Sequence, residues 1–274
     1  LYRSEFPFMI RNDFPSEEEQ VRIYRRLVDG MRGRETTFRT LDIGGDKMLS
    51  YFDYDAQANP FLGLRSIRFS LRHRDVFLQQ LRAILRAARD SEIRIMFPMI
   101  SSVEEFASAA DAVAECQADL AAEKIPFCQN VHVGMMVELP SVLELMPELC
   151  ERAEFFSIGT NDFIQYMLAV DRTNETVADL YLPHHPAVLR GLARAMEAPL
   201  RTDRDVSVCG DMAHDLCFVS FLLGIGIRKF SLDARYLPRI QKTIMATDLH
   251  EAQDLASRLL GEPTVSGIAR LLGM

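Results

Sequence analysis

The sequence predicts an α/β barrel of the (β/α)8 type that lacks one strand. Seven short apolar segments alternate with segments of helical periodicity, which indicates a parallel sheet with helical crossovers. The length of 274 residues suits one barrel domain, 1–274, although two domains are possible. Polar residues directly follow several apolar segments, as they do where parallel strands end at a binding site. An open doubly wound sheet is the alternative, because a closed barrel of this type needs an eighth strand.

The predicted strands are rich in aliphatic and aromatic residues and lie between polar loops. Segment 94–100 is apolar on both faces, as a strand buried in a parallel sheet should be. The predicted strands are 3–9, 37–43, 94–100, 131–140, 155–159, 206–212 and 229–233.

The predicted helices show apolar residues at helical spacing, and two of them begin with capping signals. Ser16 precedes three glutamates, so it is expected to cap a helix with acidic residues in its first turn. The predicted helices are 16–28, 75–88, 101–124, a segment beginning after Asp162, a helical stretch after Arg172, 187–196, and further helices from Pro238 to the end.

The composition narrows the function classes. Hydrophobic residues make up 48% and charged residues 26% of the chain, with a net charge of −8, which argues against non-specific nucleic-acid binding. No apolar run reaches the ~20 residues of a membrane span. We expect no signal peptide, because the first residues carry charge where its apolar core would begin. The five cysteines form no C-x-x-C pair, so a reducing cytoplasm is the expected compartment.

Two glycines and a lysine follow segment 37–43. Gly44 and Gly45 would let the backbone turn tightly and approach a ligand, and Lys47 would then reach an anion. An ordinary turn with a solvent-exposed lysine is the alternative.

Segment 155–172 is the most informative part of the chain, because it predicts a strand, a turn and a helix with polar residues at the turn. There Asp162 would hold a metal, Asn161 would donate to an anion and Arg172 would supply a positive charge. A helix cap made by Asn161 and Asp162, with Arg172 as a surface charge, is the alternative.

Two other strand ends carry reactive side chains. Glu138 precedes a proline and could share a divalent cation with Asp162, unless it only caps a helix or forms a salt bridge. Cys209 lies at a functional strand end, unlike the other cysteines, and alone is expected to have a chemical role. His184 and His185 favour a loop anchor over a metal site.

Several cations around two carboxylates match a small phosphorylated acid with a divalent metal, because guanidinium groups fit phosphate and carboxylate oxygens. The residues collected at strand ends are Arg3, Arg39, Lys47, Arg65, Glu138, Asn161, Asp162, Arg172 and Cys209.

This set and its surrounding motifs resemble the carboxyl-terminal domain of Enzyme I, the phosphoenolpyruvate-protein phosphotransferase of the bacterial phosphotransferase system. The motifs run through nearly the whole chain in order, and two variants, at 163–166 and 184–190, look more like the nitrogen-related branch. The matching motifs are Leu-Tyr-Arg-Ser-Glu-Phe at 1–6, Leu-Asp-Ile-Gly-Gly-Asp-Lys at 41–47, Asn-Pro-Phe-Leu-Gly-Leu-Arg at 59–65, Phe-Ser-Ile-Gly-Thr-Asn-Asp at 156–162, Ala-Val-Asp-Arg at 169–172 and Cys-Gly-Asp-Met-Ala at 209–213.

The resemblance implies a role for each of these residues. It makes Glu138 and Asp162 the ligands of Mg²⁺, and Cys209 the acid that protonates the enolate carbon as pyruvate forms. The residues that it places around phosphoenolpyruvate are Arg3, Arg39, Asn161, Asp162 and Arg172, with Lys47 and Arg65 assisting near the phosphate.

The resemblance also implies partners: an amino-terminal histidine domain, a histidine phosphocarrier protein and a second copy of the chain. No histidine here has the context of the family's phosphorylated one, and the chain starts at the family's second barrel strand, so we expect a fragment that binds phosphoenolpyruvate without complete turnover. Asp211 departs from the family's glutamate after Cys-Gly, which bears on the positioning of Cys209.

Three rival functions remain at this stage. The first is the related domain of pyruvate phosphate dikinase or phosphoenolpyruvate synthase, which would share the site residues. The second is a Mg²⁺-dependent lyase acting on pyruvate enolate, which would have no need of Cys209 or of the phosphate-binding arginines. The third is a non-catalytic sensor of phosphoenolpyruvate.

Overall fold

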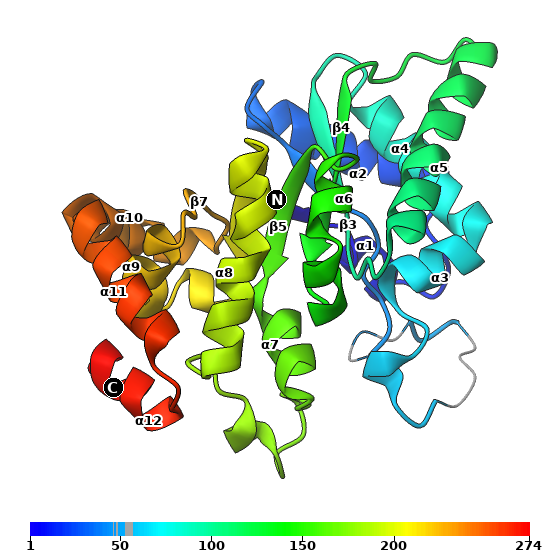
Figure 1. Cartoon of the computed structure of the whole chain (residues 1–274). Helices are drawn as coiled ribbons and strands as arrows, with labels where there is room; N and C mark the ends of the chain where they lie inside the picture. Colours follow the sequence, from blue (N-terminus) through cyan, green and yellow to red (C-terminus); the bar gives the residue numbers. More distant parts are fainter. Residues whose placement is uncertain (46, 48, 53–56) are drawn as a thin grey trace. The chain divides into compact units, whose positions relative to one another are not determined.

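The computed structural model describes residues 1–45, 47, 49–52 and 57–274, in which strands and helices alternate along the chain (Figure 1). Asp46 of the predicted motif at 41–47 lies outside the described residues. The strands are β1 (Tyr2–Arg3), β2 (Thr37–Arg39), β3 (Ile93–Phe97), β4 (Val131–Val137), β5 (Phe155–Gly159), β6 (Asp205–Cys209) and β7 (Lys229–Phe230).

The order of the strands in the sheet follows their order in the chain, from β1 to β7. The described pairings of β1 with β2, β2 with β3, β3 with β4, β5 with β6 and β6 with β7 are all parallel. A doubly wound sheet reverses its strand order at a switch point, whereas a barrel adds each new strand on the same side. The predicted fold class, an α/β barrel of the (β/α)8 type that lacks one strand, is therefore confirmed.

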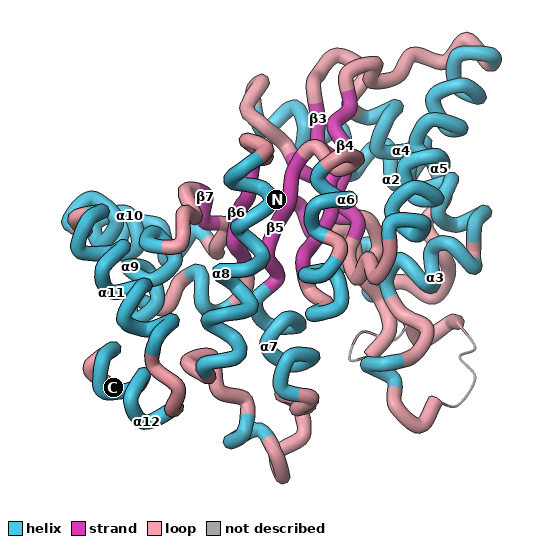
Figure 2. The backbone as a smooth tube through the Cα atoms, in the orientation of Figure 1, coloured by secondary structure: helices cyan, strands magenta, loops and turns pink. Residues whose placement is uncertain are grey.

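The chain divides into two compact units, 1–135 and 136–274, and β4 contains the boundary. In the first unit α2 packs on α4 and α4 packs on α5. Figure 2 shows these helices beside the magenta strands β3 and β4. The helices of the first unit are α1 (Phe6–Met9), α2 (Glu17–Met31), the 3₁₀ turn η1 (Pro60–Leu62), α3 (Ser66–Arg72), α4 (Arg74–Ala87) and α5 (Val103–Ala122).

In the second unit α9 packs on α10 and α11, around a small core that includes Val219, Leu223 and Ile240. The helices of the second unit are η2 (Pro140–Glu144), α6 (Met146–Cys150), α7 (Thr160–Leu168), η3 (Ala178–Leu180), α8 (Pro186–Arg201), η4 (Asp211–Ala213), α9 (Leu216–Gly224), η5 (Ala234–Tyr236), α10 (Leu237–Ala246), α11 (Leu249–Gly261) and α12 (Val265–Leu272).

Ser16 caps α2 as predicted. Its side chain accepts a hydrogen bond from the backbone N–H of Glu19, and the Glu19 side chain accepts one from the backbone N–H of Ser16. This reciprocal capping box satisfies two donors that a helix start leaves unpaired.

Among the described residues, no helix combines the length and the apolar character needed to cross a membrane.

The predicted strand 3–9 is wrong beyond Arg3, because Phe6–Met9 forms a single helical turn. Pro7 fits the first turn of a helix but has no N–H to offer a sheet. Pro7 and Phe8 are buried whereas Phe6 and Met9 are exposed, so one side of this turn faces the core.

The predicted helical stretch after Arg172 is also wrong, since that segment contains only the 3₁₀ turn η3. Asp171 accepts a hydrogen bond from the N–H of Thr173 and Asn174 from that of Thr176, and such side-chain turns compete with a helix. Five other predicted strands extend past the observed ends of β2, β3, β4, β6 and β7, because apolar residues continue into the loops. They are 37–43, 94–100, 131–140, 206–212 and 229–233.

Candidate functional site

In the first unit, the ends of β1 and β2 carry a buried ion pair. The Arg39 guanidinium contacts Glu5 directly and lies 3.1 Å from Asp42 Oδ2. Arg39 is 6% exposed, Glu5 3% and Asp42 1%, so these charges interact away from bulk water. Two carboxylates from different loops therefore hold one guanidinium in place.

Asp42 is the centre of a larger cluster. Its carboxylate lies 2.8 Å from Lys47 Nζ and 3.3 Å from Arg65 Nη2, and it accepts a hydrogen bond from the Ser66 hydroxyl. Burial opposes the charge on Asp42, but the neighbouring Arg39, Lys47 and Arg65 outweigh it and hold the pKa of Asp42 well below its usual value. Asp42 is therefore an anion near neutral pH, and it gathers three cations.

Gly44 makes this arrangement possible. It has φ +98°, and a Cβ there would lie 2.5 Å from Arg65 Cβ and 2.9 Å from the Leu64 carbonyl oxygen. Gly44 and Lys47 also exchange backbone hydrogen bonds of 2.9 and 3.2 Å. The tight turn predicted from the glycine pair is thus present, and it brings the backbone against Arg65.

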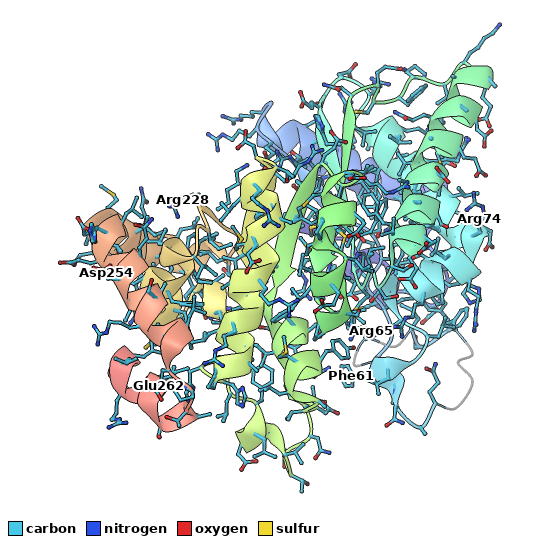
Figure 3. The ribbon with its side chains drawn as sticks, viewed as in Figure 1. Phe61, Arg65, Arg74, Arg228, Asp254 and Glu262 are labelled. Carbon is cyan, nitrogen blue, oxygen red and sulfur yellow. The ribbon has the colours of Figure 1, made fainter. Side chains whose placement is uncertain are left out.

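Arg65 and Arg3 complete the cluster, and Arg65 is buried whereas Arg3 is exposed. Arg65 is almost fully buried, and its guanidinium lies 5.7 Å from the centre of the Phe61 ring (Figure 3). The Arg3 side chain is 65% exposed and its Nε lies 3.9 Å from Glu5 Oε2. The four cations predicted at the strand ends of this unit therefore share one cluster with two acids.

In the second unit, Glu138 follows β4 and crosses the end of β5. A Cβ on Gly159 would lie 2.7 Å from Glu138 Cγ and Oε1, so the missing side chain of Gly159 makes room for this carboxylate. Asp162 follows in the first turn of α7. Glu138 is 2% and Asp162 is 8% exposed, and both therefore belong to the buried end of β4 and β5.

Asn161 is held by the loop after β6. Its Oδ1 accepts a 2.8 Å hydrogen bond from the backbone N–H of Asp211, which makes Nδ2 the donor side of the amide. Gly210 has φ +90°, and a Cβ there would lie 2.7 Å from Asn161 Oδ1 and 2.3 Å from Thr160 Oγ1. Because Asp211 acts here through its backbone, this contact does not depend on its side chain.

Arg172 is tied to α7 through its backbone, because its N–H donates to Oε1 of the buried Gln165 at 3.2 Å. Tyr181 lies close to Arg172, Asp211 and Asp162, and all three affect its pKa. Burial raises the pKa of Tyr181, the charge of Arg172 lowers it, and the carboxylates of Asp211 and Asp162 raise it. The Tyr181 hydroxyl also donates to the Asn161 carbonyl oxygen at 3.2 Å.

Cys209 ends β6 directly beside Gly159, its register partner on β5. The Ser157 hydroxyl lies 3.7 Å from Cys209 Sγ and accepts a 3.0 Å hydrogen bond from Ser207. The Thr160 hydroxyl donates to the Cys209 carbonyl oxygen at 2.8 Å. The thiol is therefore half-buried next to the Ser157 hydroxyl, which Ser207 in turn contacts.

Within each unit the structure places the predicted residues near one another, and three residues that sequence reasoning missed contact them. Glu5 and Asp42 were part of the quoted motifs, yet a carboxylate next to cations gave no signal of burial. Tyr181 gave no signal at all, because its role depends on contacts with distant residues. His185 Nδ1 accepts a hydrogen bond from the N–H of Ala187 and caps α8, which agrees with the predicted loop anchor.

The chemistry of Glu138 and Asp162 fits a magnesium ion. Both are buried carboxylates at one end of neighbouring elements, and Mg²⁺ is commonly held by one or two carboxylates together with substrate oxygens. Within the described part of the chain, no three His, Cys, Asp or Glu side chains form a metal-binding group by themselves.

Comparison with known proteins gives a consistent result. A 44% identical protein is the phosphoenolpyruvate-protein phosphotransferase of Haemophilus influenzae, where 272 residues align over 99% of this chain and 47% of that protein. Proteins of the same name from Listeria monocytogenes and Mycoplasma capricolum are 40% and 41% identical, again over 99% of this chain and 48% and 47% of theirs. This chain therefore spans about half the length of these relatives.

Among solved structures, a citrate lyase from Burkholderia xenovorans aligns with 72% of this chain and 66% of its own at 18% identity, with a TM-score of 0.47, which is too low to bear on function. A family model described as "PEP-utilising enzyme, PEP-binding domain" matches residues 1–249. The chain belongs to the family of phosphoenolpyruvate-utilising enzymes and contains their phosphoenolpyruvate-binding domain.

Proposed function

We propose that residues 1–274 act as one domain that binds phosphoenolpyruvate and Mg²⁺ and donates the phosphoryl group to a histidine on a separate domain, releasing pyruvate. The observation that carries this proposal is the set of groups around the start of α7. Glu138 and Asp162 bring buried carboxylates there, Asn161 presents an amide donor, and Arg172 and Cys209 supply a cation and a thiol.

Positive charge is what phosphoryl transfer requires most, because the transferred group spreads negative charge over its oxygens. Arg39, Lys47 and Arg65 supply it from the Asp42 cluster, while Arg3 and Arg172 supply it from more exposed positions. The Asp42 and Glu5 carboxylates hold the cations in fixed positions before substrate arrives, so little reorganisation is needed.

Glu138 and Asp162 would hold the magnesium ion. When bound, the ion supplies further neutralisation of phosphate and carboxylate charge. Asn161 Nδ2 donates to an anionic oxygen of the substrate, and its position is fixed by the Asp211 N–H.

Cys209 supplies the proton that completes pyruvate. As the phosphoryl group moves to the acceptor histidine, the bond between phosphorus and the enol oxygen breaks, and its electron pair stays on the enolate. The enolate carbon then takes the thiol proton of Cys209, and water returns a proton to the thiolate. A half-buried thiol at a strand end suits this role.

We take the partners from the family resemblance, since the relatives' shared name, phosphoenolpyruvate-protein phosphotransferase, gives only a phosphoryl donor and a protein acceptor. We propose an amino-terminal histidine domain as the first acceptor, a histidine phosphocarrier protein as the second, and a second copy of the chain as a dimer partner. We place the reaction in the cytoplasm, where the thiol of Cys209 stays reduced.

Complementation tests the proposal. The chain is mixed with the isolated histidine domain of a relative, phosphoenolpyruvate, Mg²⁺ and a phosphocarrier protein, and labelled phosphate on the carrier is measured. Transfer to the carrier supports the proposal. Cleavage of a pyruvate-derived substrate would indicate a lyase, and binding without either reaction would indicate a sensor.

A further inference from the structure

A buried glutamine lies behind the cation cluster of the first unit. Gln80, on α4, is 1% exposed. Its Oε1 accepts a 2.9 Å hydrogen bond from the backbone N–H of Leu41. Its Nε2 donates to the Ser4 hydroxyl at 2.9 Å and lies 3.4 Å from the Tyr24 hydroxyl. Both ends of the amide are therefore engaged.

The orientation of this amide is fixed by its partners. A backbone N–H can only donate, so the Gln80 oxygen must face Leu41 and the nitrogen must face Ser4. A buried amide that lost either partner would leave a polar group without water or protein to satisfy it. Gln80 thus has one low-energy placement.

Two of the three hydrogen-bond partners of Gln80, Ser4 and Leu41, stand immediately before the two acids that hold Arg39. Ser4 precedes Glu5 and Leu41 precedes Asp42. The partners lie 76 and 39 residues from Gln80 in the chain, so a single side chain joins the ends of β1 and β2 to α4. A shift at either strand end would move a carboxylate and, with it, the guanidinium of Arg39.

We propose that Gln80 is a positioning residue for phosphoenolpyruvate binding, acting through Glu5 and Asp42 on Arg39. This inference rests on the function proposed above. It differs from a purely structural role because Gln80 is tied to the residues next to both acids, whereas other buried amides of the network are not.

Gln20 provides the matched control. It is also 1% exposed, accepts a hydrogen bond from Tyr24 at 3.1 Å and donates to the Pro15 carbonyl oxygen at 2.9 Å. These bonds place it in the same network as Gln80, yet none of them involves the residues next to Glu5 and Asp42. Gln80→Met and Gln20→Met each remove an amide with two close hydrogen bonds and keep a similar volume.

The two variants are compared by thermal unfolding, by calorimetric titration with phosphoenolpyruvate and Mg²⁺, and by kcat/KM for phosphoenolpyruvate in the complemented transfer assay. Both should lower Tm to a similar extent. Only Gln80→Met should weaken the affinity and lower kcat/KM, by roughly tenfold, as expected for a misplaced charged contact. If Gln80→Met does not fold, Ser4→Ala removes one of its hydrogen bonds and should shift the affinity in the same direction by a smaller factor.

Equal affinities in the Gln80→Met and Gln20→Met variants would overturn the inference, and so would an unchanged affinity in Ser4→Ala if that variant is needed. If the unaltered chain does not bind phosphoenolpyruvate at all, the proposed function fails instead, so the two failures are distinguishable.

Discussion

Asp42 offers the sharpest test of the cation cluster. Replacing it by asparagine keeps the shape and the acceptor for Ser66 but removes the charge that faces Arg39, Lys47 and Arg65. Of these three cations, Arg39 would keep its contact with the buried Glu5 carboxylate. Breaking a buried ion pair by removing one partner costs about 3 to 5 kcal/mol, and we expect the Asp42→Asn variant to lose free energy of unfolding in that range.

The control is Asp13→Asn, which removes an acid from an exposed pair with Arg11 at 3.2 Å, where the Asp13 side chain is 72% exposed. Exposed pairs contribute little, so this variant should unfold at nearly the same denaturant concentration as the parent chain. Unfolding in urea, followed by circular dichroism at pH 7, measures both. A loss in Asp42→Asn no larger than that in Asp13→Asn would refute the account of a buried hub.

The pH dependence gives a second measure of the same group. The pKa of Asp42 in the folded protein lies well below its ordinary value of 3.8. Its contribution to stability is therefore fully present above pH 3.8 and is lost as the pH falls toward the pKa of the folded state. The difference in free energy of unfolding between the parent chain and Asp42→Asn should narrow below pH 3.8; a constant difference would contradict the low pKa.

Three further outcomes are expected. In the complemented assay, Cys209→Ala should slow pyruvate formation by about 10²- to 10⁴-fold while phosphoenolpyruvate affinity by calorimetry stays unchanged, and unchanged turnover would remove its acid role. Tyr181→Phe loses the hydrogen bond to the Asn161 carbonyl oxygen and should weaken phosphoenolpyruvate affinity roughly tenfold. The control Tyr51→Phe loses a comparable hydrogen bond to a backbone carbonyl oxygen, and equal phosphoenolpyruvate affinities in the two variants would refute a role of Tyr181 in binding. Gly210→Ala should destabilise the protein more than Gly33→Ala, since both have positive φ but only at Gly210 would a Cβ meet other atoms within 4 Å; equal urea midpoints would show that the clash is harmless.

The strand and helix pattern was readable from sequence wherever the signal is local. The capping box at Ser16 and the strand and helix around Asp162 depend on residues a few positions apart, and the structure contains them. The predicted turn is wrong, because α7 begins at Thr160 directly after β5 and places Asn161 and Asp162 in its first turn. The run 6–9 was predicted as a strand because it is apolar, but apolar content alone does not distinguish a strand from a helical turn. Pro7, which has no N–H for a sheet, favours the helical turn.

The residues of the candidate site could be predicted from the sequence, but the contacts between them could not. Arg39 and Arg65 were identified by their positions at strand ends. Their shared partner Asp42 is three residues from Arg39, but its contact with Arg65 joins positions 23 residues apart. Gln80 lies 76 residues from Ser4 in the chain. No periodicity encodes such contacts, because they depend on which loops the parallel strands bring together.

The most direct test of the central claim is calorimetric titration of the chain with phosphoenolpyruvate, with and without Mg²⁺. We predict Mg²⁺-dependent binding that Arg172→Ala and Asp162→Ala each weaken by more than about tenfold. Arg194→Ala and Asp254→Ala, which alter exposed ion pairs of the same unit, should leave the affinity unchanged. Binding that is independent of Mg²⁺, or equal in Arg172→Ala and Arg194→Ala, would contradict the account.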